Sequence, residues 1–152
     1  MDSATSTTKK NIHVMLQIFQ GIEQRNANVQ NVQRESELVQ SDVETHWPPS
    51  LPYGGTCHGW KREGITWAST WTPLQPTAAE RRMDPRVIAA SEDEVVILYH
   101  QRGLSPTGEQ FDGEVLGLYR LRDGKLARLQ MFYFDEAAVV RFLTRARNQD
   151  SL

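Results

Sequence analysis

The stretch EVLGLYRLRDGKLARLQMFYF, residues 114–134, decides the fold. At its centre the dipeptide Asp123-Gly124 separates two runs that are rich in apolar and aromatic residues. Both central residues of a type I′ turn need a positive φ angle, and Asp-Gly is one of the few pairs that tolerate it. The sequence therefore predicts an antiparallel hairpin whose strands are residues 114–122 and 125–134.

The regions on either side of this hairpin are predicted to add strands to the sheet and a helix after it. Upstream, residues 86–91 and 95–100 are short runs with the β-branched and aromatic residues that are typical of strands. Downstream, residues 136–147 have apolar residues at helical spacing, with acidic residues first and arginines last, as the helix dipole favours. The second half of the chain is predicted to be a meander of about four antiparallel strands followed by a helix.

The first half of the chain is predicted to be mainly helical. Apolar residues recur at three- and four-residue spacing and form one stripe, which consists of Ile12, Met15, Leu16, Phe19 and Ile22. Asn28 is placed to cap a second helix. A third helix is predicted after Gly59, with Trp60, Trp67 and Trp71 on one face.

The order of these elements indicates the fold class. A short strand at residues 42–47 separates the second and third predicted helices. Strands that are grouped after helices favour an α+β fold over a parallel α/β sheet. A curved antiparallel sheet wrapped by N-terminal helices encloses a cone-like space, and such concavities are the usual sites of small molecules.

Length and composition are consistent with one globular domain. The chain has 152 residues, of which 39% are hydrophobic and 24% charged. A single core is the commonest arrangement at this size. We expect one domain over residues 11–147, with a disordered tail at residues 1–10 and a second tail at residues 148–152.

Charge and hydropathy argue against several classes of protein. The formal net charge is −2 and the charges are interspersed, so no basic stripe is present to bind nucleic acid. No apolar run approaches the ~20 residues of a membrane span, and residues 1–10 lack the apolar segment of a secretory signal. Cys57 is the one cysteine, so no internal disulfide forms. These features predict a cytoplasmic protein without a nucleic-acid or membrane partner.

Three stretches resemble the SnoaL-like polyketide cyclases and the ketosteroid isomerases, which belong to the nuclear-transport-factor-like superfamily. They are DVETHWPPSLPYGG with the following Gly59, then LYRLRDGKL at residues 118–126, and MFYFD at residues 131–135. In order they resemble the family's first strand and proline-bearing loop, its strand–turn–strand unit, and its last strand entering the last helix. The resemblance covers residues 11–147 and implies the cone-shaped fold.

The resemblance also implies a chemistry that needs no cofactor and no metal. In these families a carboxylate or a histidine moves a proton next to a carbonyl group, and hydroxyl or acid groups stabilise the resulting enolate. Burial can move the pKa of such a carboxylate toward the operating pH. His58 and His100 have no second ligand at a metal spacing, so we interpret neither as a metal ligand.

Asp135 and His46 are the predicted acid/base residues. Asp135 resembles the aspartate that such polyketide cyclases use at the end of the last strand; the alternative is that it only caps the last helix. His46 lies near the place of the isomerases' base, although alignment on Pro48 would put Trp47 there. The alternative for His46 is a structural residue at the surface.

Strand alternation predicts which side chains share the inner face of the sheet. Tyr133 is the third predicted catalytic residue, as a hydrogen-bond donor to a substrate carbonyl. The predicted substrate-binding residues are Trp47, Tyr99, Tyr119, Met131, Gly117 and Ile97. The alternative for each tyrosine is core packing with its hydroxyl satisfied locally. Gly117, which lacks a side chain, is expected to widen the floor of the cavity.

Two positions depart from the isomerases. Phe19 stands nearest their oxyanion-hole tyrosine and Gly117 nearest their oxyanion-hole aspartate, and neither can donate the hydrogen bond. These departures argue against steroid isomerisation. The inward-facing polar residues and the family resemblance favour, as the leading hypothesis, a cofactor-independent cyclase, isomerase or dehydratase of natural-product biosynthesis that acts on a small hydrophobic, polyketide-like carbonyl compound. The alternative is a non-catalytic module that binds a small molecule or a protein. We expect a homodimer through the outer face of the sheet, as is common in the family.

Overall fold

The computed structural model describes residues 2–24, 37–52, 54–59 and 73–150 of the chain. The central prediction is confirmed, since strands β5 (Gln110–Arg122) and β6 (Lys125–Tyr133) form an antiparallel hairpin. The turn between them has φ angles of 55° at Asp123 and 76° at Gly124. Both values are positive, as a type I′ turn requires.

Four more strands complete one sheet. They are β1 (Val39–Trp47), β2 (Gly55–His58), β3 (Arg86–Ala90) and β4 (Glu94–Leu104). The strand order is β2-β1-β6-β5-β4-β3, so the sheet is open, with β2 and β3 at its edges. The meander β3–β6 is antiparallel throughout, as predicted, whereas β1 pairs with β6 in parallel. The sheet is therefore mixed, a detail that differs from the all-antiparallel prediction.

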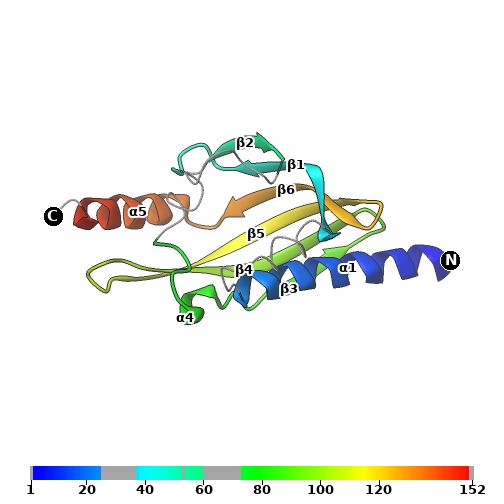
Figure 1. Cartoon of the computed structure of the whole chain (residues 1–152), viewed down its shortest axis with the longest axis horizontal. Coiled ribbons are helices and arrows are strands. Elements are labelled where there is room, and N and C mark those ends of the chain that lie inside the picture. The colour runs from blue at the N-terminus through cyan, green and yellow to red at the C-terminus, as the bar shows by residue number, and fades with distance from the viewer. Residues whose placement is uncertain (1, 25–36, 53, 60–72, 151–152) are drawn as a thin grey trace.

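Three helices lie entirely within the described part of the chain, and two of them are long. Helix α1 (Asp2–Glu23) carries the predicted apolar stripe, and helix α5 (Glu136–Asp150) follows the last strand. Helix α4 (Ala78–Arg81) is a single turn. Figure 1 shows α1 running along the sheet and α5 at the far end of the molecule.

Both ends of the chain are more helical than the sequence predicts. Helix α1 begins at Asp2, so residues 2–10, which read as a disordered tail, form its first turns. Helix α5 continues beyond residue 147 to Asp150. A helix that its apolar stripe has already nucleated is extended at little cost, even through residues that carry no apolar pattern of their own.

Two differences concern the segment around β1. The strand begins at Val39 rather than at residue 42, so Val39 is not part of a helix. Residues 55–58, for which no strand is predicted, form β2 and pair antiparallel with β1. Residues 37 and 38, just before β1, are helical, whereas the rest of the predicted second helix and the predicted third helix, with its three tryptophans, lie outside the described residues.

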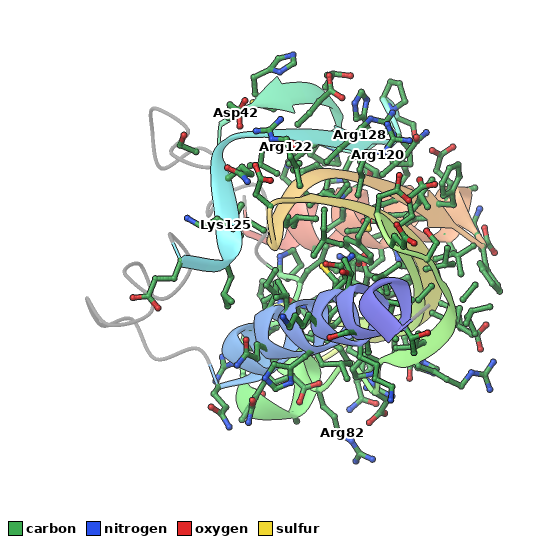
Figure 2. The ribbon with its side chains drawn as sticks, turned by 90° about the vertical axis from the view of Figure 1, so that its right-hand side faces the viewer. Asp42, Arg82, Arg120, Arg122, Lys125 and Arg128 are labelled. Atoms are coloured by element: carbon green, nitrogen blue, oxygen red, sulfur yellow. The ribbon has the colours of Figure 1, made fainter. Side chains whose placement is uncertain are left out.

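The sheet has two unlike faces, which we call the concave face and the outer face. Figure 2 shows α1 and α5 within the curve of the sheet, on the concave side. The concave face is formed by Val95, Ile97, Tyr99 and Gln101 of β4, by Val115, Gly117 and Tyr119 of β5, and by Leu129, Met131 and Tyr133 of β6. The intervening residues of each strand form the outer face.

Two apolar clusters fill the concave side. The first joins Met15 and Phe19 of α1 to the strands, and the second joins Phe142 of α5 to Trp47 and Leu74. Leu129, Met131 and Tyr133 pack against both clusters. The concave residues of β6 therefore lie where the two clusters meet.

Candidate functional site

Two tyrosine side chains converge on one sulfur atom at the centre of the concave face. The hydroxyl of Tyr99 donates a hydrogen bond to Sδ of Met131 at 3.3 Å, and the hydroxyl of Tyr119 lies 3.8 Å from the same atom. Ile97, Gly117 and Met131 are cross-strand partners in one row of the sheet. The two tyrosines flank this row from opposite sides, so their rings lean toward each other across it.

Gly117 makes this convergence possible. A Cβ atom at position 117 would lie 2.6 Å from Cε2 of Tyr119 and closer still to its hydroxyl oxygen. Any side chain here would displace the phenol, because real Cβ contacts are not this short. The expectation that Gly117 widens the floor of a cavity is therefore wrong, since the ring of Tyr119 occupies the space above it.

Phe19 of α1 covers the two tyrosines from the helix side. Its ring centroid lies 5.2 Å from that of Tyr99 and 6.0 Å from that of Tyr119, both in edge-to-face geometry. Tyr119 is 3% exposed, and burial raises the pKa of its phenol well above the usual range. The phenol is therefore a neutral hydrogen-bond donor at any physiological pH.

The concave residues of β6 remain partly open to solvent. Leu129, Met131 and Tyr133 are half-buried, whereas Tyr99 and Tyr119 are buried. Ile97 is fully buried in the first cluster, and Trp47 is buried in the second. Of the predicted substrate-binding residues, the structure thus brings Tyr99, Tyr119 and Met131 into direct contact.

Asp135 caps the last helix. Its Oδ1 atom accepts a hydrogen bond from the backbone N–H of Ala138 at 3.0 Å, three residues further on, which is the geometry of an N-cap. The side chain is exposed and follows Tyr133, the end of β6, by two residues. The predicted alternative, a capping role, is present in the structure, and it uses one of the two carboxylate oxygens.

His46 lies on the outer face, away from the tyrosines. In the parallel pairing of β1 with β6, His46 lies opposite Gln130. The preceding residue, Thr45, lies opposite Leu129 of the concave face, so the side chain of His46 points to the other face. Its Nε2 lies 3.0 Å from Oε2 of Glu44, and its Nδ1 lies 3.0 Å from the hydroxyl of Thr56. The structure therefore does not bring the two predicted acid/base residues together.

Glu44 is the centre of a polar network around His46. Its carboxylate accepts a hydrogen bond from Nε of Arg128 at 2.9 Å, and it lies 3.8 Å from the imidazole of His58. The hydrogen bonds from His46 and from Arg128 hold the pKa of Glu44 below its usual value. This network connects β1 to β6 on the outer face of the sheet and does not face the concave side.

Polar groups on the concave side are neutral in the described part of the chain. The buried polar side chains there and in the adjoining loops are Asn11, Gln75, Gln101 and Ser105. Among the described residues, no buried carboxylate or imidazole is found, and no group of three acidic, histidine or cysteine side chains is placed to hold a metal ion. The site therefore offers hydrogen-bond donors and acceptors rather than charges.

Gln101 was not among the predicted site residues. It is 1% exposed, and it lies on the concave face two residues after Tyr99. The alternation through Val95, Ile97 and Tyr99 continues without a break to residue 101. The same pattern that identified Tyr99 therefore identifies Gln101, once β4 is seen to extend past residue 100.

The fold and this face of the sheet match a known family. A SnoaL-like domain matches residues 22–129, which is more than half of the chain. The chain belongs to the SnoaL-like domain family. The predicted resemblance to this family is thereby confirmed, and so is the α+β cone fold.

Solved SnoaL-like and NTF2-like structures support the fold. TerC co-crystallised with polyporic acid has 23% sequence identity and a TM-score of 0.70, over 89% of this chain and 98% of that one. An NTF2-like protein of unknown function from Burkholderia pseudomallei K96243 has 19% identity and a TM-score of 0.69, over 89% and 98%. A candidate SnoaL-like polyketide cyclase from Jannaschia sp. CCS1 has 15% identity and a TM-score of 0.62, over 87% and 90%.

These comparisons leave the activity of this SnoaL-like protein to be argued from its own residues. At such identities the structural likeness shows the fold alone. None of the curated proteins compared with the chain matches it. Within the described residues, no helix has the length and apolar character to cross a bilayer.

Proposed function

We propose that the protein binds an apolar, polyketide-like carbonyl compound on the concave face and catalyses proton transfer next to the carbonyl. The convergence of Tyr99 and Tyr119 on Met131 carries this proposal. A thioether sulfur is a weak acceptor, so a carbonyl oxygen in its place would receive stronger hydrogen bonds from the same two phenols. Two donors on one oxygen would stabilise an enolate as it forms.

Two of the three predicted catalytic residues, Tyr133 and Asp135, have a part in this proposal, together with two predicted substrate-binding tyrosines. Tyr99 and Tyr119 hold the carbonyl oxygen, and Tyr133, in the row next to Met131, contacts the substrate at the partly open side. Asp135 is the proposed proton acceptor, because it follows the same strand and its cap uses only one carboxylate oxygen. His46 has no part in proton transfer here, since it lies on the outer face.

The test uses 2-tetralone, a bicyclic ketone with acidic protons next to its carbonyl. Binding is measured by calorimetry, and deuterium uptake at the carbon beside the carbonyl is measured by NMR in heavy water. We expect Tyr119→Phe to weaken binding several-fold, the size of one hydrogen bond. We expect Asp135→Asn, which can still cap the helix, to slow exchange by at least about 100-fold at unchanged binding.

His46→Gln is the matched control, because it alters the other predicted acid/base residue while leaving the concave face intact. Its exchange rate should equal that of the wild type. Saturable binding without any exchange would reject the enzyme and leave the binding module. Absence of saturable binding would reject the whole proposal.

The second candidate function is a binding module without catalysis. It is favoured by the neutral character of the buried polar groups on the concave side in the described residues. A proton acceptor is usually placed in a buried site, whereas Asp135 is exposed at the end of the sheet. The exchange experiment separates this candidate from the enzyme, because a pure binding module holds the ketone without labelling it.

We infer that the protein forms a homodimer through its outer face. Along β5 the outward residues run from acidic to apolar to basic: Asp112, Glu114, Leu116, Leu118, Arg120 and Arg122. Leu98 and Phe132 widen the apolar centre as cross-strand partners of Leu116, and Phe132 is 46% exposed. Two copies related by a two-fold axis would place the basic end of each strand against the acidic end of the other.

A charge exchange tests the dimer. Variant one carries Arg120→Glu and Arg122→Glu, and variant two carries Asp112→Arg and Glu114→Arg. Each alone should be monomeric by light scattering, because like charges would face each other, and an equal mixture should form a heterodimer. A wild type that remains monomeric at all working concentrations contradicts the inference.

The cytoplasmic location stays a prediction.

A further inference from the structure

Gln101 is an amide buried between the two apolar clusters. Its side chain is 1% exposed. On one side Tyr99 belongs to the first cluster, and on the other Gly103 touches Phe142 and Leu74 of the second. Directly across the sheet its partner is Gly113, which has no side chain. The amide therefore occupies an otherwise apolar stretch of the concave face.

The carbonyl oxygen of this amide has no hydrogen-bond donor in the described part of the chain. Two other buried polar side chains have partners: Asn11 donates to the backbone oxygen of Glu92 at 2.6 Å, and Ser105 accepts from the N–H of Glu109 at 3.0 Å. A buried acceptor without a donor lowers the stability of the folded protein. A bound molecule can supply the missing partner, and a site built in this way selects ligands that carry the matching group.

We propose that Gln101 accepts a hydrogen bond from a hydroxyl group of the substrate and thereby selects hydroxylated carbonyl compounds. This inference rests on the proposed function, because the carbonyl of the same molecule is held by the tyrosines. Tyr99 and Gln101 are two residues apart on one strand face, about 7 Å between Cα atoms. Because the Tyr99 hydroxyl reaches Met131 and Gln101 lies beyond Tyr99 on the strand, the two groups would contact separate positions of a fused bicyclic compound. A ligand with the carbonyl alone satisfies the donors but leaves Gln101 unpaired.

The first arm of the test needs no ligand. Gln101→Met keeps the shape of the side chain and removes the unpaired acceptor, so the melting temperature should rise by about 2–4 °C. Asn11→Leu is the matched control, since it removes a buried amide that does have a partner, and it should lower the melting temperature. A fall for Gln101→Met as well would mean that the amide has a structural role, and it would overturn the inference. Gln101→Leu repeats the test without a sulfur atom.

The second arm compares 2-tetralone with its 5-, 6- and 7-hydroxy derivatives by calorimetry. At least one hydroxy isomer should bind the wild type about fivefold tighter than 2-tetralone, as one neutral hydrogen bond allows. Its methoxy counterpart, which cannot donate, should show no gain. In Gln101→Met the hydroxyl gain should disappear while 2-tetralone binds as before.

The outcomes separate this inference from the proposed function. If 2-tetralone binds but no hydroxy isomer binds tighter, or if the gain survives in Gln101→Met, the role of Gln101 is wrong and the tyrosine site stands. If no tetralone binds at all, the proposed function fails and this inference fails with it.

Discussion

The two faces of the same three strands differ in how they treat polar groups. On the concave face of β4, β5 and β6 the polar side chains are neutral, namely the phenols of Tyr99, Tyr119 and Tyr133 and the amide of Gln101. On the outer face they are mostly charged and lie in ion pairs, such as Arg122 with Asp42 (Figure 2). Burial of an unpaired charge costs far more than burial of a hydroxyl. The comparison teaches that neutral polar groups and charged groups are separated by one residue along each strand, so the proposed recognition and the proposed association use opposite faces of the sheet.

The largest expected effect comes from neighbouring residues of β4 on opposite faces. Ile97 is fully buried on the concave face, and Leu98 is half-buried on the outer face. Ile97→Ala should lower the free energy of unfolding by about 2–5 kcal/mol, because it removes core contacts and leaves a cavity. Leu98→Ala should cost about 1 kcal/mol, since less area returns to water. Urea denaturation measures both.

Both variants are measured at the lowest workable protein concentration, because a dimer that buries Leu98 would increase the free-energy cost of Leu98→Ala. Equal losses for the two variants at that concentration would break the contrast between the faces.

A smaller effect is expected at Gly117, within the concave face itself. Gly117→Ala forces the phenol of Tyr119 out of its place and should cost about 1–3 kcal/mol of folding free energy. Gly21→Ala is the control: no atom lies within 4 Å of the added Cβ, and α1 should gain about 0.5–1 kcal/mol. Thermal unfolding that shows the same sign for both substitutions would mean that Tyr119 does not fill the space.

The smallest expected effect is a pH dependence of folding stability that arises from a carboxylate on the outer face. The pKa of Glu44 is lowered in the folded state, first by His46 and then by Arg128. Its stabilising contribution is therefore complete above the ordinary carboxyl pKa, and it is lost as the pH falls below about 4.5. Glu44→Gln should flatten the fall in melting temperature between pH 6 and pH 3. An unchanged slope in the variant would show that Glu44 is not coupled to folding.

Much of the fold was predictable because it depends on local patterns. The Asp123-Gly124 turn, the meander and the helix that follows residue 135 all follow from turn chemistry and periodicity. The strand β2 was not predictable in this way, because Gly54-Gly55 resembles a turn and the strand exists through its pairing with β1. The parallel pairing of β1 with β6 is likewise set by tertiary structure rather than by any local signal.

The candidate site was predictable only in part. Alternation places Tyr99, Tyr119 and Met131 on one face correctly, but it does not reveal that two phenols lean over Gly117 to reach one sulfur. His46 shows the limit of the method. Successive side chains of a strand point to opposite faces, so an uncertainty of one residue in the alignment decides between Trp47 and His46. Trp47 is the buried residue of the two.

The seam between β1 and β6 has a consequence for the order of folding. Arg122 and Lys125 meet across a two-residue turn, whereas Val39 must find Leu126 from more than half the chain away. Closure of a long loop costs more entropy than closure of a short one, and distant contacts form more slowly. The hairpin is therefore expected to nucleate the sheet, with β1 joining last. The ion pair between Glu44 and Arg128 then stabilises the docked position of β1. This strand assembles last and is expected to be the first to detach.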